Sequence, residues 1–382
     1  MTTILDIADA AAGGAAPAPS VRHYCPGGRE SGGGIGRLIG YVADAAAARG
    51  DRHAIVDTRG PSWSPLRSAA RLLAALALLG RDRIAAPERL HHIHVAGRGS
   101  TMRKLILTWV ARTLGCVHVL HLHDYDYASD LDGRPAWLRR RIAAMFRGAD
   151  AVIVLGQRDR KTVEEQLGAA PGRVTVAHNC VPDPGERPRR TTGEPVILFL
   201  GRLSPRKGVP ELLEALARPE MASLRWRAVL AGDGPVDDYR REAAARGLAD
   251  RVTMTGWVGE AEVRDLCAGS DILVLPSHAE GMAMAVLEGL AGGLAVVTTR
   301  VGSHEEAIID GETGLFVPVG DPPALAAGLA RLVADPGERQ RLASAGRRLY
   351  LRRFAIDGYL RRLDAFYRAT SARRAPTTVT SE

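Results

Sequence analysis

The fold is decided by residues 196–208, VILFLGRLSPRKG, in which an apolar run leads directly into a basic turn flanked by two glycines. Val196–Leu200 has the length and composition of a buried strand. The glycines allow the backbone to approach a ligand, and Arg202 and Lys207 are placed to hold a diphosphate from two sides. The helix that opens near Gly208 adds its positive end. Taken alone, the segment is explained about equally well as a solvated basic turn.

Short apolar runs alternate with amphipathic stretches on both sides of this segment. The predicted strands are Val21–Tyr24, Ala54–Asp57, His91–Val95, Val117–Leu122, Ala151–Leu155, Val174–Val176, Val196–Leu200, Arg227–Leu230, Val252–Thr255, Ile272–Leu275 and Ala295–Thr298. Helical patterns lie between them, among them Arg37–Ala48, Leu66–Leu79, Met102–Leu114, Trp137–Phe146 and, near the end, Gly358–Arg368. Strand, helix and strand at this spacing predict an α/β protein with parallel sheets.

The proline-rich stretch Val181–Pro195 interrupts this alternation and predicts a linker between two α/β domains. The expected organisation is a disordered start (1–20), an N-terminal α/β domain (21–185), a linker (186–195), a C-terminal α/β domain (196–353), a helix packing back on the N-terminal domain (354–371) and a disordered tail (372–382). Because ligands bind at the carboxyl ends of the strands in open α/β sheets, we expect a site in a cleft between the domains.

Composition and charge narrow the choice of partners. The 382 residues carry a net charge of +8, and the positive balance lies in residues 1–190, which suggests an anionic partner. Nucleic acid is not favoured, since aromatic side chains for base stacking are scarce there. The four cysteines are far apart, and neither a secretory signal nor a long apolar run is evident. We therefore expect a cytoplasmic protein.

A second motif, Pro276–Glu288, follows the predicted strand Ile272–Leu275. Glu280 falls in the loop or at the start of a helix, where a carboxylate is favoured. Glu288 lies two turns inside an otherwise apolar stretch. A buried carboxylate needs hydrogen-bond donors, which sugar or ribose hydroxyls would provide. For a lone glutamate, exposure on the polar face of an amphipathic helix is the simpler explanation.

Taken together, the motifs carry a family resemblance. Gly201-Arg202-Leu203 with Gly208, Ala231–Pro235, Glu280 with Glu288, and Asp310–Gly314, in this order, resemble the retaining glycosyltransferases of family 4. The resemblance extends from about Val21 onward and is strongest over residues 195–320. It implies a GT-B fold, in which two Rossmann-like domains with parallel sheets face a central cleft. It also implies that the N-terminal domain (21–185) lies on the acceptor side and that the C-terminal domain (196–353) binds the nucleotide sugar. The activity implied is transfer of a sugar, a hexose for preference, from a nucleoside diphosphate sugar to an acceptor hydroxyl with retention at the anomeric carbon.

The resemblance also implies roles for donor-site residues. Arg202 and Lys207, after Gly201, would bind the donor diphosphate and neutralise the leaving group. Glu280 would hydrogen-bond the transferred sugar, helped by backbone amides of Gly281, Met282 and Ala283. Glu288 would take the ribose hydroxyls, and the backbone around Trp257 and Val258 would meet the nucleobase. Ala283 stands where the family often has glycine or proline, and Ser303–Glu306 departs from the family pattern, so the latter is given no role.

The N-terminal half holds further candidates. Gly33 and Gly34 belong to a glycine cluster between the first strand and a helix, which we expect to contact a donor or acceptor phosphate; a flexible linker is the plain alternative. In the stretch Gly97–Lys104, Ser100 is a predicted N-cap, and Arg98, Arg103 and Lys104 would surround an anion on the acceptor side.

The histidines around residues 118–124 raise the question of a metal site. His121 and His123 share a face of the predicted strand, but His118 points to the other face, so we predict no metal. The family resemblance gives His123 another role, contact with the transferred sugar or the acceptor hydroxyl at the end of the fourth strand. No cofactor beyond the nucleotide sugar is expected.

The acceptor is predicted only by class. A glycan or a lipid-linked oligosaccharide in surface polysaccharide assembly is favoured, since the helix beginning Trp137–Ile142 carries tryptophan and arginines that could touch an anionic membrane at its inner face. A solvated basic helix face is the alternative. Two other functions stay open, a nucleotide-sugar epimerase of the same architecture and a non-catalytic nucleotide-sugar-binding protein.

Overall fold

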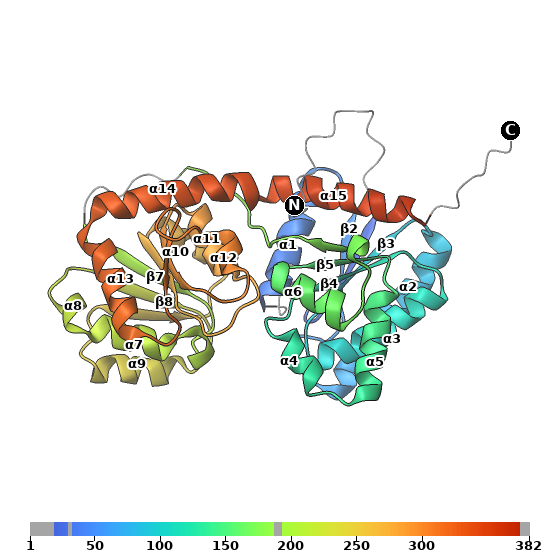
Figure 1. The fold of residues 1–382 in the computed structure, drawn as a ribbon, viewed down its shortest axis with the longest axis horizontal. Coiled ribbons are helices and arrows are strands. Elements are labelled where there is room, and N and C mark those ends of the chain that lie inside the picture. Colours follow the sequence, from blue (N-terminus) through green and yellow to red (C-terminus); the bar gives the residue numbers. More distant parts are fainter. Residues whose placement is uncertain (1–18, 30–32, 187–192, 375–382) are drawn as a thin grey trace. The chain divides into compact units, whose positions relative to one another are not determined.

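The computed structural model describes residues 19–29, 33–186 and 193–374. The expectations of disorder for residues 1–18 and 375–382, and of a linker at 187–192, lie outside these residues. The chain divides into two compact units (Figure 1). Among the described residues, unit 1 combines those up to Asn179 with those from Ile356 onward, and unit 2 comprises those from Cys180 to Ala355.

Unit 1 is built on a six-stranded, all-parallel sheet with the order β2-β1-β3-β4-β5-β6. The strands are β1 (Val21–Cys25), β2 (His53–Asp57), β3 (Leu90–Val95), β4 (His118–Leu122), β5 (Ala151–Val154) and β6 (Val174–Val176). The helices are α1 (Gly33–Ala48), α2 (Pro65–Ala85), α3 (Gly99–Thr113), α4 (Tyr127–Asp132), α5 (Ala136–Arg147), α6 (Gln157–Lys161) and α15 (Ile356–Ala372). The order reverses between β1 and β3, so ligands are expected at the carboxyl ends of these strands.

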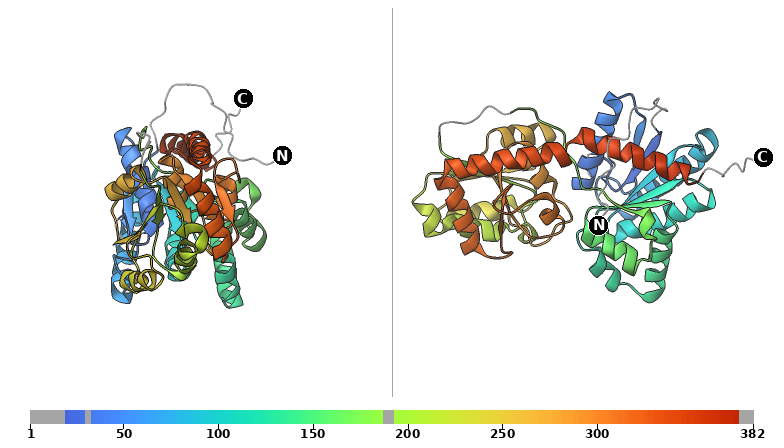
Figure 2. Two further views of the ribbon diagram at one scale, coloured as in Figure 1. Left: turned by 90° about the vertical axis from the view of Figure 1, so that its left-hand side faces the viewer. Right: turned by 45° about the horizontal axis from the view of Figure 1, so that its top comes forward.

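The two faces of this sheet are covered differently. On one face, apolar side chains such as Tyr24, Ile93 and Leu120 form a buried core with α2, α3 and α5. On the other face lie α1 and α15, which pack against each other (Figure 2). The C-terminal helix α15 also reaches the sheet through Tyr367, whose hydroxyl lies 2.6 Å from Nδ1 of His92.

Unit 2 has a six-stranded parallel sheet with the order β12-β11-β10-β7-β8-β9. Its strands are β7 (Val196–Leu200), β8 (Arg227–Ala231), β9 (Val252–Gly256), β10 (Ile272–Leu275), β11 (Ala295–Thr299) and β12 (Leu315–Val317). Its helices are α7 (Val209–Ala217), α8 (Pro219–Ala222), α9 (Val236–Ala245), α10 (Glu260–Ala268), α11 (Met284–Ala291), α12 (His304–Ala307), α13 (Pro322–Ala334) and α14 (Pro336–Arg353). This is the doubly wound Rossmann order, which reverses between β7 and β10.

The predicted strands are confirmed to within a residue or two at each end. The sequence reasoning missed β12, which has only three residues, and the long helix α14. The boundary between the units falls at Asn179 and Cys180. It lies before the predicted linker because Val181 bridges to Ala355 and its carbonyl accepts a hydrogen bond from the Tyr350 hydroxyl at 2.9 Å.

None of the helices in the described parts of the chain combines the length and the apolar character that crossing a lipid bilayer demands.

Candidate active site

Two loops of unit 2 meet where its strand order reverses. The loop after β7 makes a 3₁₀ turn at Pro205–Lys207, and the loop after β10 runs from Pro276 to Ala283. The Arg206 carbonyl accepts a hydrogen bond from the His278 amide at 2.8 Å, and the Arg206 guanidinium donates to the Ala279 carbonyl at 2.5 Å. Gly208 (φ 74°) makes this approach possible, since a Cβ there would lie 2.1 Å from the Pro276 carbonyl oxygen.

These loops bring Lys207 and Glu280 together. The Lys207 Nζ lies 2.6 Å from Oε1 of Glu280, and the Arg206 guanidinium lies 3.5 Å from the same oxygen. Glu280 is only 7% exposed. Burial by itself would raise the pKa of its carboxyl, but the adjacent Lys207 and Arg206 cations bring that pKa below its ordinary value. The site therefore holds a fixed carboxylate beside two cations.

A third loop, after β11, supports the second. The Ser303 amide donates to the Gly281 carbonyl at 2.8 Å. A Cβ at Gly302 (φ 55°) would lie 2.1 Å from the Glu280 carbonyl oxygen, so only glycine fits there. His304 is fully buried, with Nδ1 3.1 Å from the Thr298 hydroxyl. Burial lowers the pKa of His304 although Glu280 acts in the opposite direction.

The other predicted donor-site residues differ in exposure. Glu288 is 7% exposed, and all eight residues of α11 are buried, so it does not face water. Arg202 is exposed, with its guanidinium 3.5 Å from an Asp233 oxygen. Trp257 is 70% exposed beside the buried Val258. Gly201 is half-buried at the end of β7, and Gly281, Met282 and Ala283 line the tight loop after Glu280.

In unit 1, His123 directly follows β4. Its amide donates to the Val95 carbonyl at 2.8 Å, and its Nε2 lies 2.9 Å from Nδ1 of His94. The residue is half-buried at the carboxyl end of the sheet. Gly33 and Gly34, at the start of α1, are exposed.

The predicted basic cluster of unit 1 is not brought together as expected. Helix α3 begins at Gly99, so Ser100 is not its N-cap; the Ser100 hydroxyl instead accepts a hydrogen bond from the Ala96 amide at 3.3 Å. Arg98 is exposed and Arg103 is half-buried. Lys104 is fully buried and donates to the Tyr24 carbonyl at 3.1 Å and the Thr58 hydroxyl at 2.7 Å. Burial lowers its pKa to about 7. Lys104 is therefore not included among the anion-binding residues.

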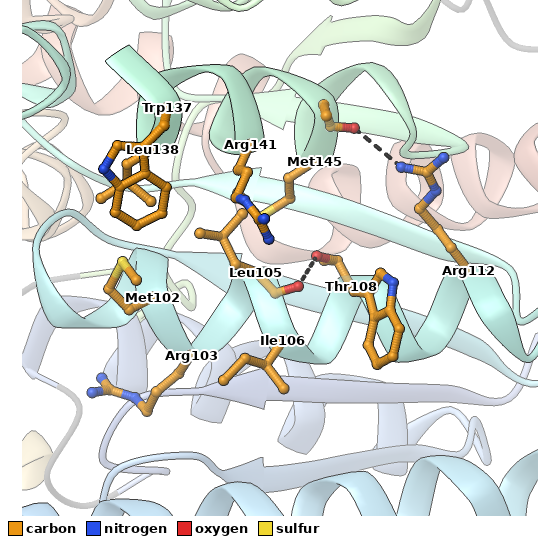
Figure 3. Close-up of a pocket in the computed structure, with 12 residues that line it drawn as sticks. Met102, Arg103, Leu105, Ile106, Thr108, Arg112, Trp137, Leu138, Arg141 and Met145 are labelled. Atoms are coloured by element: carbon orange, nitrogen blue, oxygen red, sulfur yellow. Dashed lines mark hydrogen bonds between the residues drawn. The ribbon is translucent and has the colours of Figure 1, made fainter. Parts of the chain in front are cut away.

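A groove of about 620 Å³ lies between α3 and α5 of unit 1. Trp137 and Arg141 extend from α5 toward Met102 and Leu105 of α3 (Figure 3). Several apolar side chains that line it are exposed to solvent: Met102, Ile106, Trp109 and Trp137. Arg103, Arg112 and Arg141 also line it, so the groove is both apolar and basic.

Comparison with known proteins decides the family. The model "Glycosyl transferases group 1" matches residues 186–349, and the model "Glycosyltransferase Family 4" matches residues 32–183. Together the two matches span most of both units. The chain belongs to the group 1, family 4 glycosyltransferases. This glycosyltransferase is therefore an enzyme of sugar transfer, and the predicted family and the two-domain α/β GT-B fold are confirmed.

Its relatives act on diverse molecules. It is 28% identical to alpha-D-kanosaminyltransferase of Streptomyces kanamyceticus over 72% of the chain and 76% of that protein. It is 31% identical to D-inositol 3-phosphate glycosyltransferase of Acidothermus cellulolyticus over 68% of the chain and 62% of that protein. Among solved structures, sucrose-phosphate synthase of Thermosynechococcus elongatus matches 93% of the chain and all of that chain, with a TM-score of 0.74 and 21% identity. The structural likeness shows the fold.

The sequence reasoning missed three residues of the glycosyltransferase that the structure places at this site. Arg206 lay within the quoted motif but received no role, although it holds the Ala279 carbonyl and lies beside Glu280. His304 lay in the segment Ser303–Glu306, which departs from the family pattern, and Gly302 directly precedes that segment. The signal that could have found them is their position directly after β11, next to β10 in the sheet.

Proposed function

We propose that this glycosyltransferase moves a sugar, a hexose for preference, from a nucleoside diphosphate sugar to an acceptor hydroxyl with retention at the anomeric carbon. The proposed setting is the cytoplasm, in polysaccharide or lipid-linked glycan assembly. The bond between the anomeric carbon and the diphosphate oxygen breaks, the acceptor oxygen bonds to the carbon, and the hydroxyl proton is released.

The observation that carries the proposal is the ion pair of Lys207 and Glu280 where the strand order of unit 2 reverses. This is where doubly wound sheets bind nucleotides. A leaving diphosphate gains negative charge, and preorganised cations stabilise that charge in the transition state. Lys207, Arg206 and the exposed Arg202 are placed at the turn after β7 to do so, while the Glu280 carboxylate accepts hydrogen bonds from sugar hydroxyls.

The ligands of solved structures that resemble the chain support a nucleotide-sugar donor. Structures of the HepE protein of Anabaena, with UDP and with UDP-glucose, match 92% of the chain with TM-scores of 0.71 and 0.70, at 17% and 18% identity. A nucleotide-sugar donor agrees with these ligands. We assign Glu288 to the ribose, the backbone at Trp257 and Val258 to the base, and His123 with Gly33 and Gly34 to the sugar, acceptor or phosphate side. The cations of unit 2 let the transfer proceed without a metal ion or other cofactor.

The groove between α3 and α5 supports an acceptor at a membrane. Exposed tryptophans beside arginines are suited to the interface of an anionic bilayer, where the rings enter the headgroup region and the guanidinium groups meet lipid phosphates. Trp109 is 68% exposed and Trp137 is 59% exposed, and Arg112 and Arg141 line the same groove. We assign this surface to peripheral contact with the inner face of the membrane.

A ligand panel tests the donor site. Thermal unfolding is followed with UDP-, GDP-, ADP- and dTDP-sugars, for wild type, for Glu288→Ala and for the control Glu214→Ala, an exposed carboxylate on α7. A donor at about 100 times its dissociation constant stabilises by roughly 2.7 kcal/mol. We expect one nucleotide to shift the wild type and the control but not Glu288→Ala. Absence of any shift would count against a nucleotide-sugar enzyme.

Incubation with the stabilising donor then separates the three functions. NMR spectra of the donor sugar are recorded without acceptor and with glycan or lipid-linked acceptors. A transferase releases nucleoside diphosphate and forms a new glycosidic linkage only when the acceptor is present. An epimerase changes the donor sugar without acceptor, and a binding protein leaves every spectrum unchanged; either result rejects the proposal.

Vesicle sedimentation tests the membrane contact. Wild type is expected to sediment with vesicles rich in phosphatidylglycerol and not with pure phosphatidylcholine. The double variant Trp109→Ser, Trp137→Ser should lose most of that binding, while Trp63→Ser, which alters an exposed tryptophan outside the groove, should retain it. Wild type that stays in the supernatant with anionic vesicles contradicts the membrane assignment.

A further inference from the structure

One face of the unit 1 sheet is lined with histidines. They come from all four neighbouring strands at one side of the sheet, β2, β1, β3 and β4, and from the residue after β4: His53, His23, His92, His94, His121 and His123. The strand register places His23 beside His92 and His94 beside His121. Four of them, His23, His92, His94 and His121, are at most 2% exposed.

The histidines form two chains of ring-nitrogen contacts. The first runs from His53 through His23 and His94 to His123, with N···N distances of 3.0, 3.1 and 2.9 Å. The second runs from the Tyr367 hydroxyl through His92 to Nδ1 of His121, with distances of 2.6 and 3.2 Å. Both chains end at β4. At the end of the second chain, Nε2 of His121 is buried and has no hydrogen-bond partner among the described residues.

The ring that carries this unpartnered nitrogen lies beside His123, the end of the first chain of contacts. One ring nitrogen each from His94, His121 and His123 can be chosen so that all three lie within 4.8 Å of one another. The rings of His121 and His123 have centroids 3.9 Å apart, and Nδ1 of His94 lies 2.9 Å from Nε2 of His123. Buried polar atoms without partners are rare in proteins, so a bound ligand would explain the buried Nε2 of His121.

The spacing of His94 and His123 is close to that of two metal ligands, and a ring nitrogen of His121 lies within 4.8 Å of both. Zinc–nitrogen bonds of about 2.0–2.1 Å in tetrahedral geometry put two ligand nitrogens about 3.3 Å apart. The 2.9 Å contact between His94 and His123 would have to open by only a few tenths of an ångström. A second group, His23, His92 and His94, also has one ring nitrogen from each residue within 4.8 Å of the others. Both ring nitrogens of His23 and of His92 are already engaged, so this group offers no unpartnered nitrogen.

The neighbouring histidines supply the outer contacts that metal ligands need. Ligating histidines usually hydrogen-bond through their other ring nitrogen, which fixes the tautomer and the ring orientation. His92 holds Nδ1 of His121, and His23 holds Nε2 of His94.

We propose that His94, His121 and His123 bind one divalent transition-metal ion, with zinc as the occupant. Three neutral imidazoles suit zinc, cobalt, nickel or copper, whereas magnesium and calcium prefer oxygen ligands. Three protein ligands leave the fourth tetrahedral position open. The half-buried His123 gives the ion its route from solvent. The proposal does not rest on the proposed sugar transfer, which needs no metal, because it is tested by binding of the ion. His123 would bind the ion through Nε2, the nitrogen beside His94, and contact the sugar or acceptor through Nδ1.

The experiment is a Co²⁺ titration of the full chain, prepared without a polyhistidine tag and stripped with a chelator. Wild type should bind one equivalent with the visible absorption of tetrahedral Co²⁺, and one equivalent of Zn²⁺ should displace it. His121→Gln and His123→Gln should each weaken binding by more than the roughly 10- to 100-fold that loss of an outer partner causes. The control His118→Gln alters a buried histidine of the same strand on the opposite face and should bind as wild type does.

The outcomes are distinct. Wild type that takes up neither Co²⁺ nor Zn²⁺ in a saturable, one-to-one manner overturns the proposal. Full binding by both His121→Gln and His123→Gln overturns it as well, since the ion then lies elsewhere. Circular dichroism checks that each variant is folded. If His121→Gln is not folded, the half-buried His123 decides, with loss of binding supporting the site and retained binding rejecting it.

Discussion

The two sheets of the molecule are alike in strand number and in being wholly parallel, yet they place their titratable groups differently. In unit 2 the described strands contain no histidine, and the charged groups of the candidate site lie in the loops that follow β7 and β10. In unit 1 seven histidines lie within the strands themselves, and an eighth follows β4 directly. Loop residues can be charged because water or a ligand reaches them, whereas strand residues between two helical layers are neutral or paired with an opposite charge, as Arg22 of β1 is with Asp82. The same architecture therefore supports charge-based chemistry in one unit and neutral nitrogen ligands in the other.

The largest expected effect is on the rate of sugar transfer, and it tests the cations in the loop after β7 of unit 2. Lys207→Ala should lower the rate of transfer by on the order of 100-fold or more, since it removes a preorganised cation from the leaving group. Arg202→Ala should act in the same direction. Arg227→Ala removes an exposed cation at the amino end of β8 and serves as the control. Steady-state kinetics with the identified donor give the comparison, and near-normal turnover in both site variants would reject the assignment.

The next effect is acid sensitivity that is greater in unit 1, which has several buried histidines, than in unit 2, where burial lowers the pKa of His304. Burial lowers the pKa of His53 and of His91 to about 4, and lowers that of His92, His94 and His121 as well. Below about pH 6.5 the unfolded chain takes up protons that the folded unit cannot, so stability is lost as the pH falls toward the folded pKa. Each such histidine contributes about 1.4 kcal/mol per pH unit in this window.

Hydrogen exchange at pH 7 and pH 5.5, corrected for intrinsic rates, measures this difference residue by residue. The amides of β3 and β4 should lose protection by well over tenfold more than those of β7 and β10 in the metal-stripped protein. Equal losses in the two sheets would mean that the histidine face is not buried and neutral in solution.

A smaller effect on the pH dependence of stability comes from Lys104, because burial lowers the pKa of its ammonium group to about 7. Between about pH 7 and 10.5 the unfolded chain holds a proton that the folded unit has released, so the stability of unit 1 should rise with pH by up to about 1.4 kcal/mol per unit. Lys104→Met should abolish this slope, and the exposed Lys161→Met should keep it. Exchange of β3 amides from pH 7.5 to 9.5 provides the measurement; an unchanged slope in Lys104→Met would show that the ammonium group is solvated.

The smallest effect concerns Trp257. Because we assign donor contact to the backbone at this position and the ring is 70% exposed, Trp257→Ala should change donor affinity by less than about threefold, under 1 kcal/mol. Isothermal titration with the stabilising nucleotide measures it. A tenfold or larger loss would show that the indole ring itself stacks on the base.

The sequence predicted the two parallel sheets well because their strands are continuous apolar runs bounded by turn residues. It also predicted that Glu280 and Lys207 act together, since both follow strands and their motifs occur in a family order. It could not show that Arg206, rather than the more exposed Arg202, lies beside Glu280, since this depends on the 3₁₀ turn at Pro205–Lys207. It also placed Lys104 in an anion site, because a helical pattern does not reveal that this turn of α3 faces Tyr24 and Thr58.

The face of the unit 1 sheet that carries His23, His53, His92, His94, His121 and His123 could likewise not be predicted from the sequence. Within a single strand, His118 and His121 lie on opposite faces, and from this spacing the sequence predicted no metal site. The third ligand of the proposed site comes from β3, whose register with β4 places His94 beside His121. Register between strands that are far apart in sequence is set by tertiary packing and cannot be read from spacing within one strand.

The helix α15 has a consequence for the order in which the protein is made. The Tyr367 hydroxyl that closes the histidine face lies 275 residues after His92, and all of unit 2 is encoded between α15 and the rest of unit 1. Unit 2 is continuous and can fold as soon as it leaves the ribosome. Unit 1 must wait for α15, with this face of its sheet covered only by α1, for on the order of ten seconds at roughly 5–20 residues per second. During that interval the imidazoles of the nascent chain are accessible to water and to any free metal ion, until α15 packs over them.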